Sequence, residues 1–161
     1  MNEMLMGIGI VVLVALAAVV SGLLAAYSWL RIDHPVSESY AALMTADGLW
    51  AGCYLLMILG GGGLLTDVAL VGKGLFSALA GVAWLRFVSE YTGDSEWIPG
   101  WVWRVLAAEA VGFGLLVAID PSNLVISEIT VGQIGMVTFA AESGGPLTAV
   151  QLLISAGLVT V

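Results

Sequence analysis

The sequence predicts an all-α membrane protein, a transmembrane helical bundle with four full spans, an incomplete fifth span and a short extracellular β-hairpin. Hydrophobic residues make up 60% of the 161 residues and charged residues only 10%. A soluble domain is typically about 45–50% apolar and about 25% charged. The apolar residues also occur in runs of the length that crosses a bilayer, about 20 residues. We therefore expect one membrane-embedded domain over residues 1–161, multi-pass in the cell membrane, with the lipid bilayer as a partner.

Residues 64–91 form the span around which the others can be placed. Small residues recur in it at four-residue spacing, Gly74 with Ala78 and Ser77 with Gly81. Such spacing lets the backbones of two membrane helices approach closely. We expect this span to have both a lipid-facing side and a side that packs on other helices.

The remaining spans are expected at residues 4–29, 40–59, 101–119 and 146–161. The first is too long for a signal peptide and has no basic residue before it. The last contains about 22 Å of helix at about 1.5 Å per residue, whereas the hydrocarbon core is about 30 Å thick. We therefore expect the fifth span to be incomplete, and the chain to be a fragment or a shortened reading frame.

Residues 124–142 differ in character from the spans. They contain two β-leaning runs on either side of a segment bounded by Gly132 and Gly135. Two such runs around a glycine-bounded turn are typical of a β-hairpin. Because a lone hairpin is marginal in water, we expect it to lie on the bundle.

Three arginines suggest the orientation of the spans. Arg31, Arg86 and Arg104 all flank the loops on one side of the expected bundle. Because basic residues accumulate on the cytoplasmic side, the N-terminus is expected outside the cell.

Charged residues within the spans are the candidate functional residues: Asp47, Lys73, Arg86 and Glu109. A charge in hydrocarbon costs free energy unless it is paired or faces water. From their expected depths, Lys73 should pair with Glu109 and Arg86 with Asp47. The alternatives are structural ion pairs, a proton or ligand relay, and unpaired charges that reach toward the membrane surface.

Several classes of function are excluded. With four basic residues against twelve acidic ones, the chain has no basic patch for nucleic acid. One cysteine, Cys53, and one histidine, His34, form no metal-binding pattern. No catalytic or phosphate-binding motif is present. We expect no enzyme activity, no cofactor and no metal. The acidic, lysine-poor composition would suit concentrated salt, where charges are screened.

The order of several features resembles a known family. Trp50 and Tyr54 lie in the second span, and residues 87–93 (FVSEYTG) close the third span after Trp84. Residues 120–123 (DPSN) end the fourth, and the expected hairpin and a Gly-Gly-Pro follow. This pattern resembles the N-terminal seven-helix membrane region of microbial sensor histidine kinases, in its haloarchaeal form. The resemblance covers roughly residues 5–161, with Asp-Pro where that family usually has Asn-Pro.

The resemblance implies a membrane-embedded sensory input module of a two-component system. Its partners would be cytoplasmic PAS and kinase domains of the same or an adjacent protein, and it could form a homodimer. The alternative is a small transporter or channel subunit with a polar path through Asp47, Lys73 and Glu109.

Overall fold

The computed structural model describes the chain in six segments: residues 2–34, 36–60, 63–93, 98–119, 126–134 and 137–160. Within these segments, side chains are not described for residues 2–4, 126–144, 152 and 155–160.

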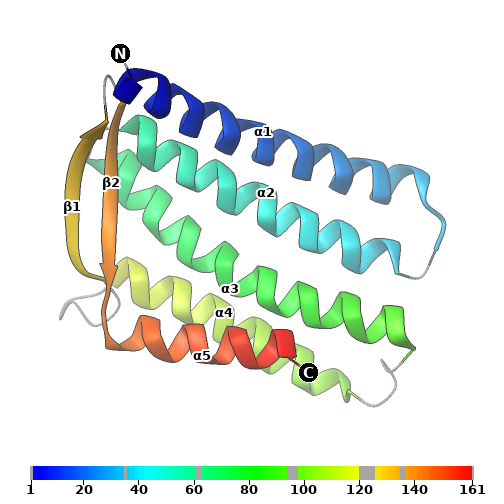
Figure 1. The fold of residues 1–161 in the computed structure, drawn as a ribbon. Helices are drawn as coiled ribbons and strands as arrows, with labels where there is room; N and C mark the ends of the chain where they lie inside the picture. Colours follow the sequence, from blue (N-terminus) through cyan, green and yellow to red (C-terminus); the bar gives the residue numbers. More distant parts are fainter. Residues whose placement is uncertain are drawn as a thin grey trace.

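Four long helices run side by side as antiparallel neighbours (Figure 1). They are α1 (Asn2–Arg31), α2 (Ser37–Gly60), α3 (Leu64–Thr92) and α4 (Gly100–Ile119). All four are long and apolar enough to cross a membrane. Because a bilayer provides no hydrogen-bonding partners, helices that satisfy their own backbone groups are the expected form for these stretches.

The tight connection between α1 and α2 is held by side-chain hydroxyl groups. The hydroxyl of the buried Ser28 donates to the carbonyl of Ser37 at 2.9 Å, and that of Ser39 donates to the carbonyl of Val36 at 2.9 Å. In the same connection the exposed His34 accepts a hydrogen bond through Nδ1 from the Val36 N–H. These bonds bind backbone carbonyls near the start of α2, so the two helices turn back on each other within a few residues.

Small residues set the distances between neighbouring helices. A Cβ atom added at Gly48 of α2 would lie 3.4 Å from the backbone nitrogen of Gly22 in α1. One added at Gly72 of α3 would lie 2.6 Å from the Cys53 sulfur of α2. One added at Gly74 would lie 3.0 Å from Val117 of α4. Close backbone approach at glycine is a common way of joining membrane helices.

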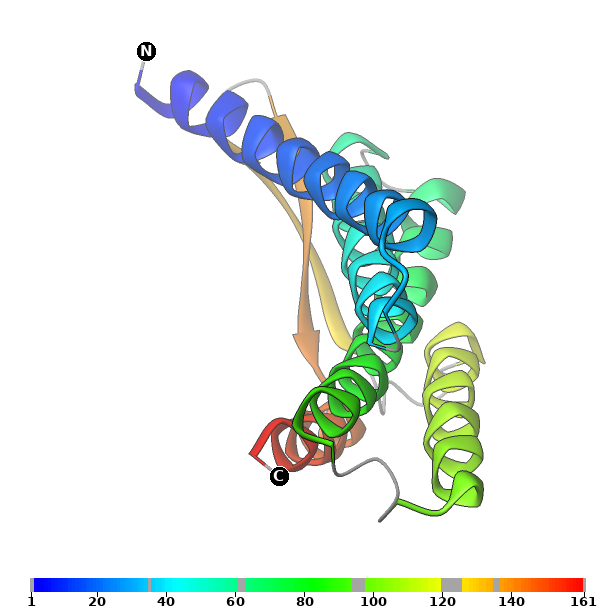
Figure 2. The same ribbon diagram turned by 90° about the vertical axis from the view of Figure 1, so that its right-hand side faces the viewer.

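The helix α3 is the centre of the arrangement, because it contacts α2, α4 and α5 (Pro146–Thr160). Figure 2 shows α4 and α5 flanking α3 from opposite sides, and α5 on the same side as the two strands. The expected packing face of α3 is present: Ala78 is buried and Gly74 lies against α4.

Two strands, β1 (Ile126–Ile134) and β2 (Val137–Gly144), pair antiparallel across one end of the helices (Figure 1). The strands contact α1, α2 and α5. The turn expected between Gly132 and Gly135 is misplaced, because residues 132–134 belong to β1 and Ile134 pairs with Val137. A glycine weakens a strand but keeps both of its backbone hydrogen-bonding groups, so a glycine does not have to end one.

The predicted fold class is wrong as stated. A chain with a paired two-stranded sheet is not all-α. The predicted extracellular position of the hairpin is not supported either, because nothing in the described residues assigns the strands to the outer side of the membrane. The finding that bears on the membrane is narrower: four helices are long and apolar enough to span it. The 15-residue α5 is shorter than these four.

Candidate functional site

The structure places the four candidate residues on three helices. Asp47 is on α2, Lys73 and Arg86 are on α3, and Glu109 is on α4. Asp47, Lys73 and Glu109 are each partly buried, whereas Arg86 is exposed.

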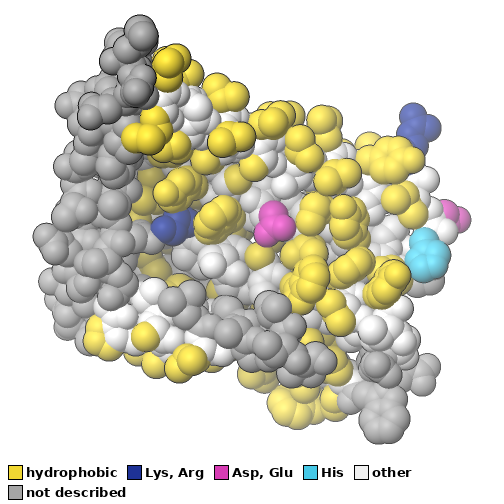
Figure 3. Space-filling view, viewed as in Figure 1, with side chains coloured by type: hydrophobic (Ala, Val, Ile, Leu, Met, Phe, Trp, Pro, Cys, Tyr) yellow, Lys and Arg dark blue, Asp and Glu magenta, His cyan; other side chains and the backbone are white. Residues whose placement is uncertain are grey.

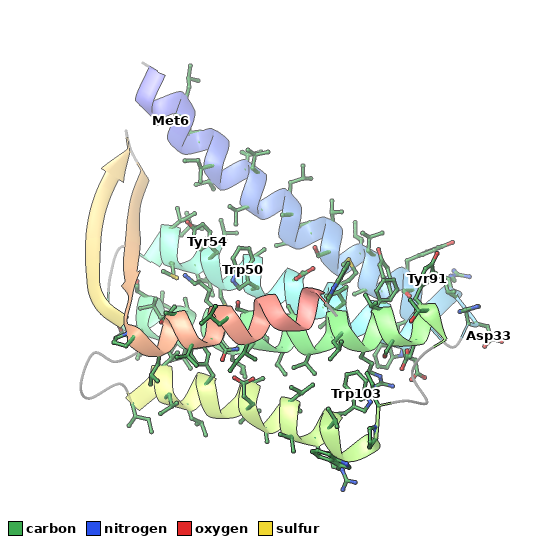
Figure 4. All side chains as sticks on the ribbon, turned by 60° about the horizontal axis from the view of Figure 1, so that its bottom comes forward. Met6, Asp33, Trp50, Tyr54, Tyr91 and Trp103 are labelled. Atoms are coloured by element: carbon green, nitrogen blue, oxygen red, sulfur yellow. The ribbon has the colours of Figure 1, made fainter. Side chains whose placement is uncertain are left out.

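An aromatic stack connects α2 with the lysine of α3. The rings of Trp50 and Tyr54 are stacked, with centroids 5.9 Å apart and planes 11° from parallel. The Lys73 Nζ lies 5.7 Å from the centroid of the Tyr54 ring. This is the distance at which a cation is attracted by the negative face of an aromatic ring. Figure 4 shows Trp50 and Tyr54 side by side on α2.

Asp47 lies on the same side of α2 as this stack. Positions 47, 50 and 54 are spaced i, i+3 and i+7, which places them on one face of a helix. We call Asp47, Trp50, Tyr54 and Lys73 the polar stripe. Figure 3 shows hydrophobic side chains covering this side of the molecule, with an acidic and a basic side chain among them over α2 and α3.

The expected pair between Lys73 and Glu109 is not formed. Both residues are described, and no ion pair joins them. The Glu109 carboxylate instead lies near the side chain of Gln151 on α5, while the Lys73 amine lies over Tyr54.

The reason is the vertical register of α3 and α4. A Cβ added at Gly114 would lie 3.0 Å from the Leu75 Cβ, so these two residues are level. Lys73 is two residues from Leu75 toward the hairpin end, and Glu109 is five residues from Gly114 toward the other end. Seven residues correspond to about 10 Å along the helix axes, which is too far for an ion pair. The prediction wrongly assumed that the ends of the two helices were level.

The expected pair between Arg86 and Asp47 is not formed either, because Arg86 pairs with Glu90 instead. Arg86 Nε donates to Glu90 Oε1 at 2.8 Å, one turn further along α3. The Arg86 side chain is 53% exposed, and such i, i+4 pairs contribute only about 0.3–0.5 kcal/mol. The other carboxylate oxygen of Glu90 is buried and has no hydrogen-bond partner among the described residues.

Aromatic rings gather near this pair. Phe87 lies between three rings, with centroid distances of 5.6 Å to Tyr40, 6.1 Å to Trp84 and 5.8 Å to Tyr91. Aromatic residues are enriched where membrane helices reach the water interface. The cluster therefore indicates that this end of α2 and α3 lies near a membrane surface.

Sequence reasoning missed two contributions to the site. Trp50 and Tyr54 contribute to the resemblance, but the sequence does not show that they lie beside Lys73. Their spacing from Asp47, i+3 and i+7, does indicate that the three residues share one face of a helix. Gln151 had no such signal, because its contact with Glu109 joins residues 42 positions apart in the chain.

The arrangement brings charged side chains and aromatic rings together inside the long apolar helices. No group of histidine, cysteine and acidic residues that could hold a metal occurs within the described segments. Asp47 and Lys73 flank aromatic rings inside membrane-length helices. Glu109 lies near Gln151 of α5, about 10 Å along the helix axes from Lys73.

The fold and these residues define a multi-pass helical membrane protein with polar groups inside its spans. A family model described as the N-terminal 7TM region of histidine kinase matches residues 13–161. The chain belongs to this family, and it is a membrane sensory input module of the kind found in histidine kinases. This confirms the family that the sequence resembles, while its haloarchaeal form stays a prediction; residues 120–123, which contributed to the resemblance, lie outside the described residues. Neither a curated protein nor a solved structure matches the chain.

Proposed function

We propose that this chain is the signal-receiving part of a histidine kinase system and performs no phosphate transfer itself. The observation that supports the proposal is the polar stripe, which places Asp47 and Lys73 beside stacked rings inside the spans of a sensory family. Polar groups at such depth are costly and are usually retained for function. Phosphate transfer would belong to cytoplasmic kinase domains, with or without PAS domains, on the same or an adjacent protein.

The absence of catalysis is tested with the purified chain. Incubated with radiolabelled ATP and Mg²⁺, it should incorporate no phosphate and retain no nucleotide on equilibrium dialysis. A purified histidine kinase core serves as the positive control. Autophosphorylation of the isolated chain would refute the proposal.

Transmission would proceed through α3, which contacts α2, α4 and α5 and carries the Arg86–Glu90 pair in its last two turns. A movement of Lys73 in the polar stripe could therefore reach the other end of the bundle, because both lie on the same continuous helix, α3. In a kinase that contains this region, Tyr54→Leu should change the basal rate of autophosphorylation while membrane insertion stays normal. Leu115→Ala, at an exposed position of α4, is the control and should leave the rate unchanged.

We propose that the N-terminus lies outside the cell. Arg31, Arg86 and Arg104 all lie near the end of the bundle where α1 and α3 finish and α4 begins, and all are exposed. Basic residues at one end of a bundle favour its cytoplasmic location.

Cysteine labelling in intact cells tests this orientation. In a Cys53→Ala background, a membrane-impermeant maleimide should label Asn2→Cys in intact cells and Ser95→Cys only after the cells are opened. The reverse pattern would show that the topology is inverted.

A further inference from the structure

The polar stripe lies on a side of α2 and α3 that two other helices border. The helix α1 packs on α2, and α5 packs on α3, while the strand β2 contacts α1, α2 and α5. Figure 4 shows Trp50 and Tyr54 on α2, between α1 and α5. We call this side of α2 and α3 the stripe face. Trp50 remains 40% exposed there, so a molecule dissolved in the membrane can reach its ring.

Asp47 is a hydrogen-bond acceptor without a donor on this face. It lies ten residues after Ser37, where α2 begins, about 15 Å along the helix axis and within a candidate span. Within the part of the chain that the structure describes, no hydrogen bond or ion pair reaches its carboxylate. A carboxylate at that depth is costly unless it is paired or faces water. The stripe face therefore favours a molecule that brings a donor and a positive charge.

The aromatic rings beside Asp47 indicate where a cation would lie. A cation is attracted by the face of a tryptophan or tyrosine ring within about 6 Å. Lys73 already holds that position at Tyr54, with its Nζ 5.7 Å from the ring centroid. Tyr54 is about 10 Å from Asp47 along α2, and like charges repel each other. A second cation is therefore favoured at the other end of the stack, beside Trp50 and Asp47.

Three classes of amphiphilic molecule differ in what they offer to Asp47. An alcohol offers a donor without a charge, and a quaternary ammonium offers a charge without a donor. A primary ammonium offers both, and charge-assisted hydrogen bonds are roughly twice as strong as neutral ones. Its apolar body would pack against the hydrophobic side chains that cover this side of the molecule in Figure 3. A primary amine is thus the best chemical match.

We propose that the stripe face binds a membrane-soluble primary amine, whose ammonium group donates to Asp47 and lies against Trp50. The inference deepens the proposed function and rests on it, because it names the chemical class of signal that the sensory module receives. The bound amine lies on α2, which packs along α3. Its binding is thereby coupled to the helix that carries Lys73.

Photolabelling of the full chain in phosphatidylcholine nanodiscs tests the proposal. The probe is dodecylamine that carries a diazirine in its chain, close to the amine. Photolysis should give a saturable adduct in the part of α2 that contains Asp47 and Trp50, identified by mass spectrometry. Unlabelled dodecylamine should displace the probe. Dodecanol and dodecyltrimethylammonium should displace it at least about tenfold less well, because each lacks half of the charged hydrogen bond.

Substitutions on the stripe face separate the contributions of the charge and the ring. Asp47→Asn should weaken probe binding at least about tenfold, because it removes the charge that pairs with the ammonium. Asp47→Glu keeps the carboxylate and should stay within about threefold of the natural chain. Trp50→Leu should weaken binding about threefold, as expected for the loss of one cation–π contact.

Asp67→Asn is the matched control. It makes the same chemical change at an exposed position in the first turn of α3, and probe binding should not change. The Asp47→Asn chain should insert and fold, because a neutral amide costs less than a carboxylate inside an apolar span. Thermal unfolding in the same nanodiscs checks that both variants are folded.

Three outcomes would overturn the proposal. They are labelling that does not saturate, equal displacement by dodecylamine and either comparison compound, and equal binding by the Asp47→Asn and Asp67→Asn chains. A chain that gives any of these results and still incorporates no phosphate leaves the proposed function intact. Phosphate incorporation would refute the proposed function whatever the amine does, so the two failures are distinguishable.

Discussion

At the scale of single residues, Cys53 shows how closely α2 and α3 approach. Its sulfur contacts α3 at Gly72, where a Cβ would lie only 2.6 Å away. The neighbouring core residues Met57, Ala69 and Leu70 are buried and leave little room for adjustment. The glycine is thus required by a neighbour on another helix, although the sequence shows it only as one small residue among many.

We predict that Gly72→Ala destabilises the protein by about 1–3 kcal/mol, because the added methyl overpacks a filled core. Cys53→Ala removes the obstructing sulfur, so the double variant should cost less than the sum of the two single changes. The measurement is reversible unfolding in detergent micelles.

Gly52→Ala is the control for this prediction. Gly52 lies beside Cys53 on α2, but no atom of the described residues lies within 4 Å of its added Cβ. The change should be neutral or stabilise the helix by about 0.5–1 kcal/mol. Equal losses from Gly52→Ala and Gly72→Ala would contradict the close contact.

At the scale of the elements, the helix ends and the helix rotations have different origins. The end of α3 is local: Gly93 adopts a left-handed conformation with φ 81° and ψ 7°, which residues with a Cβ rarely adopt. The rotation of α3 depends on other helices, since Gly74 faces α4 and Lys73 faces Tyr54 of α2.

We predict that Gly93→Ala costs about 1–2 kcal/mol through the left-handed backbone alone, because no atom of the described residues lies within 4 Å of its added Cβ. Gly93→Asn should cost less, since asparagine tolerates this conformation. Gly112→Ala, inside α4 and also without neighbours, is the control and should not destabilise. Thermal unfolding in micelles measures all three, and a loss for Gly112→Ala equal to that for Gly93→Ala would argue against a backbone cause.

At the scale of the whole molecule, the charged residues of α3 and α4 belong to two separate groups of contacts. Lys73 belongs to the stack with Tyr54 on α2, and Glu109 belongs to the contact with Gln151 on α5. The sequence suggested one group, an ion pair across α3 and α4. The register of these helices, with Leu75 level with Gly114, separates the two charges instead.

We predict that Lys73→Met and Glu109→Gln have additive effects on the free energy of unfolding, within about 0.3–0.5 kcal/mol, as for independent sites. Tyr54→Leu combined with Lys73→Met is the comparison, and it should be non-additive because these side chains touch. Strong coupling between positions 73 and 109 would mean that the two helices have a different register in the membrane.

The sequence by itself determined that this is a membrane protein, the approximate locations of its four long apolar helices and its family. Hydropathy and length are properties of consecutive residues, so they can be added along the chain without knowing what each helix touches. The same holds for the glycine at the end of α3, because the conformation of a helix end is local.

Only the tertiary structure decided which residues share the site. Apolar residues occur all round α2 and α3, so no stripe in the sequence indicates which side packs and which side stays open. Depth along a helix was estimated from its ends, and an offset of a few residues between α3 and α4 was enough to separate Lys73 from Glu109 by about 10 Å. Rotation and register depend on contacts between residues far apart in the chain. Here those contacts include Gly74 against Val117 and Gly72 against Cys53, and these fix how the helices meet.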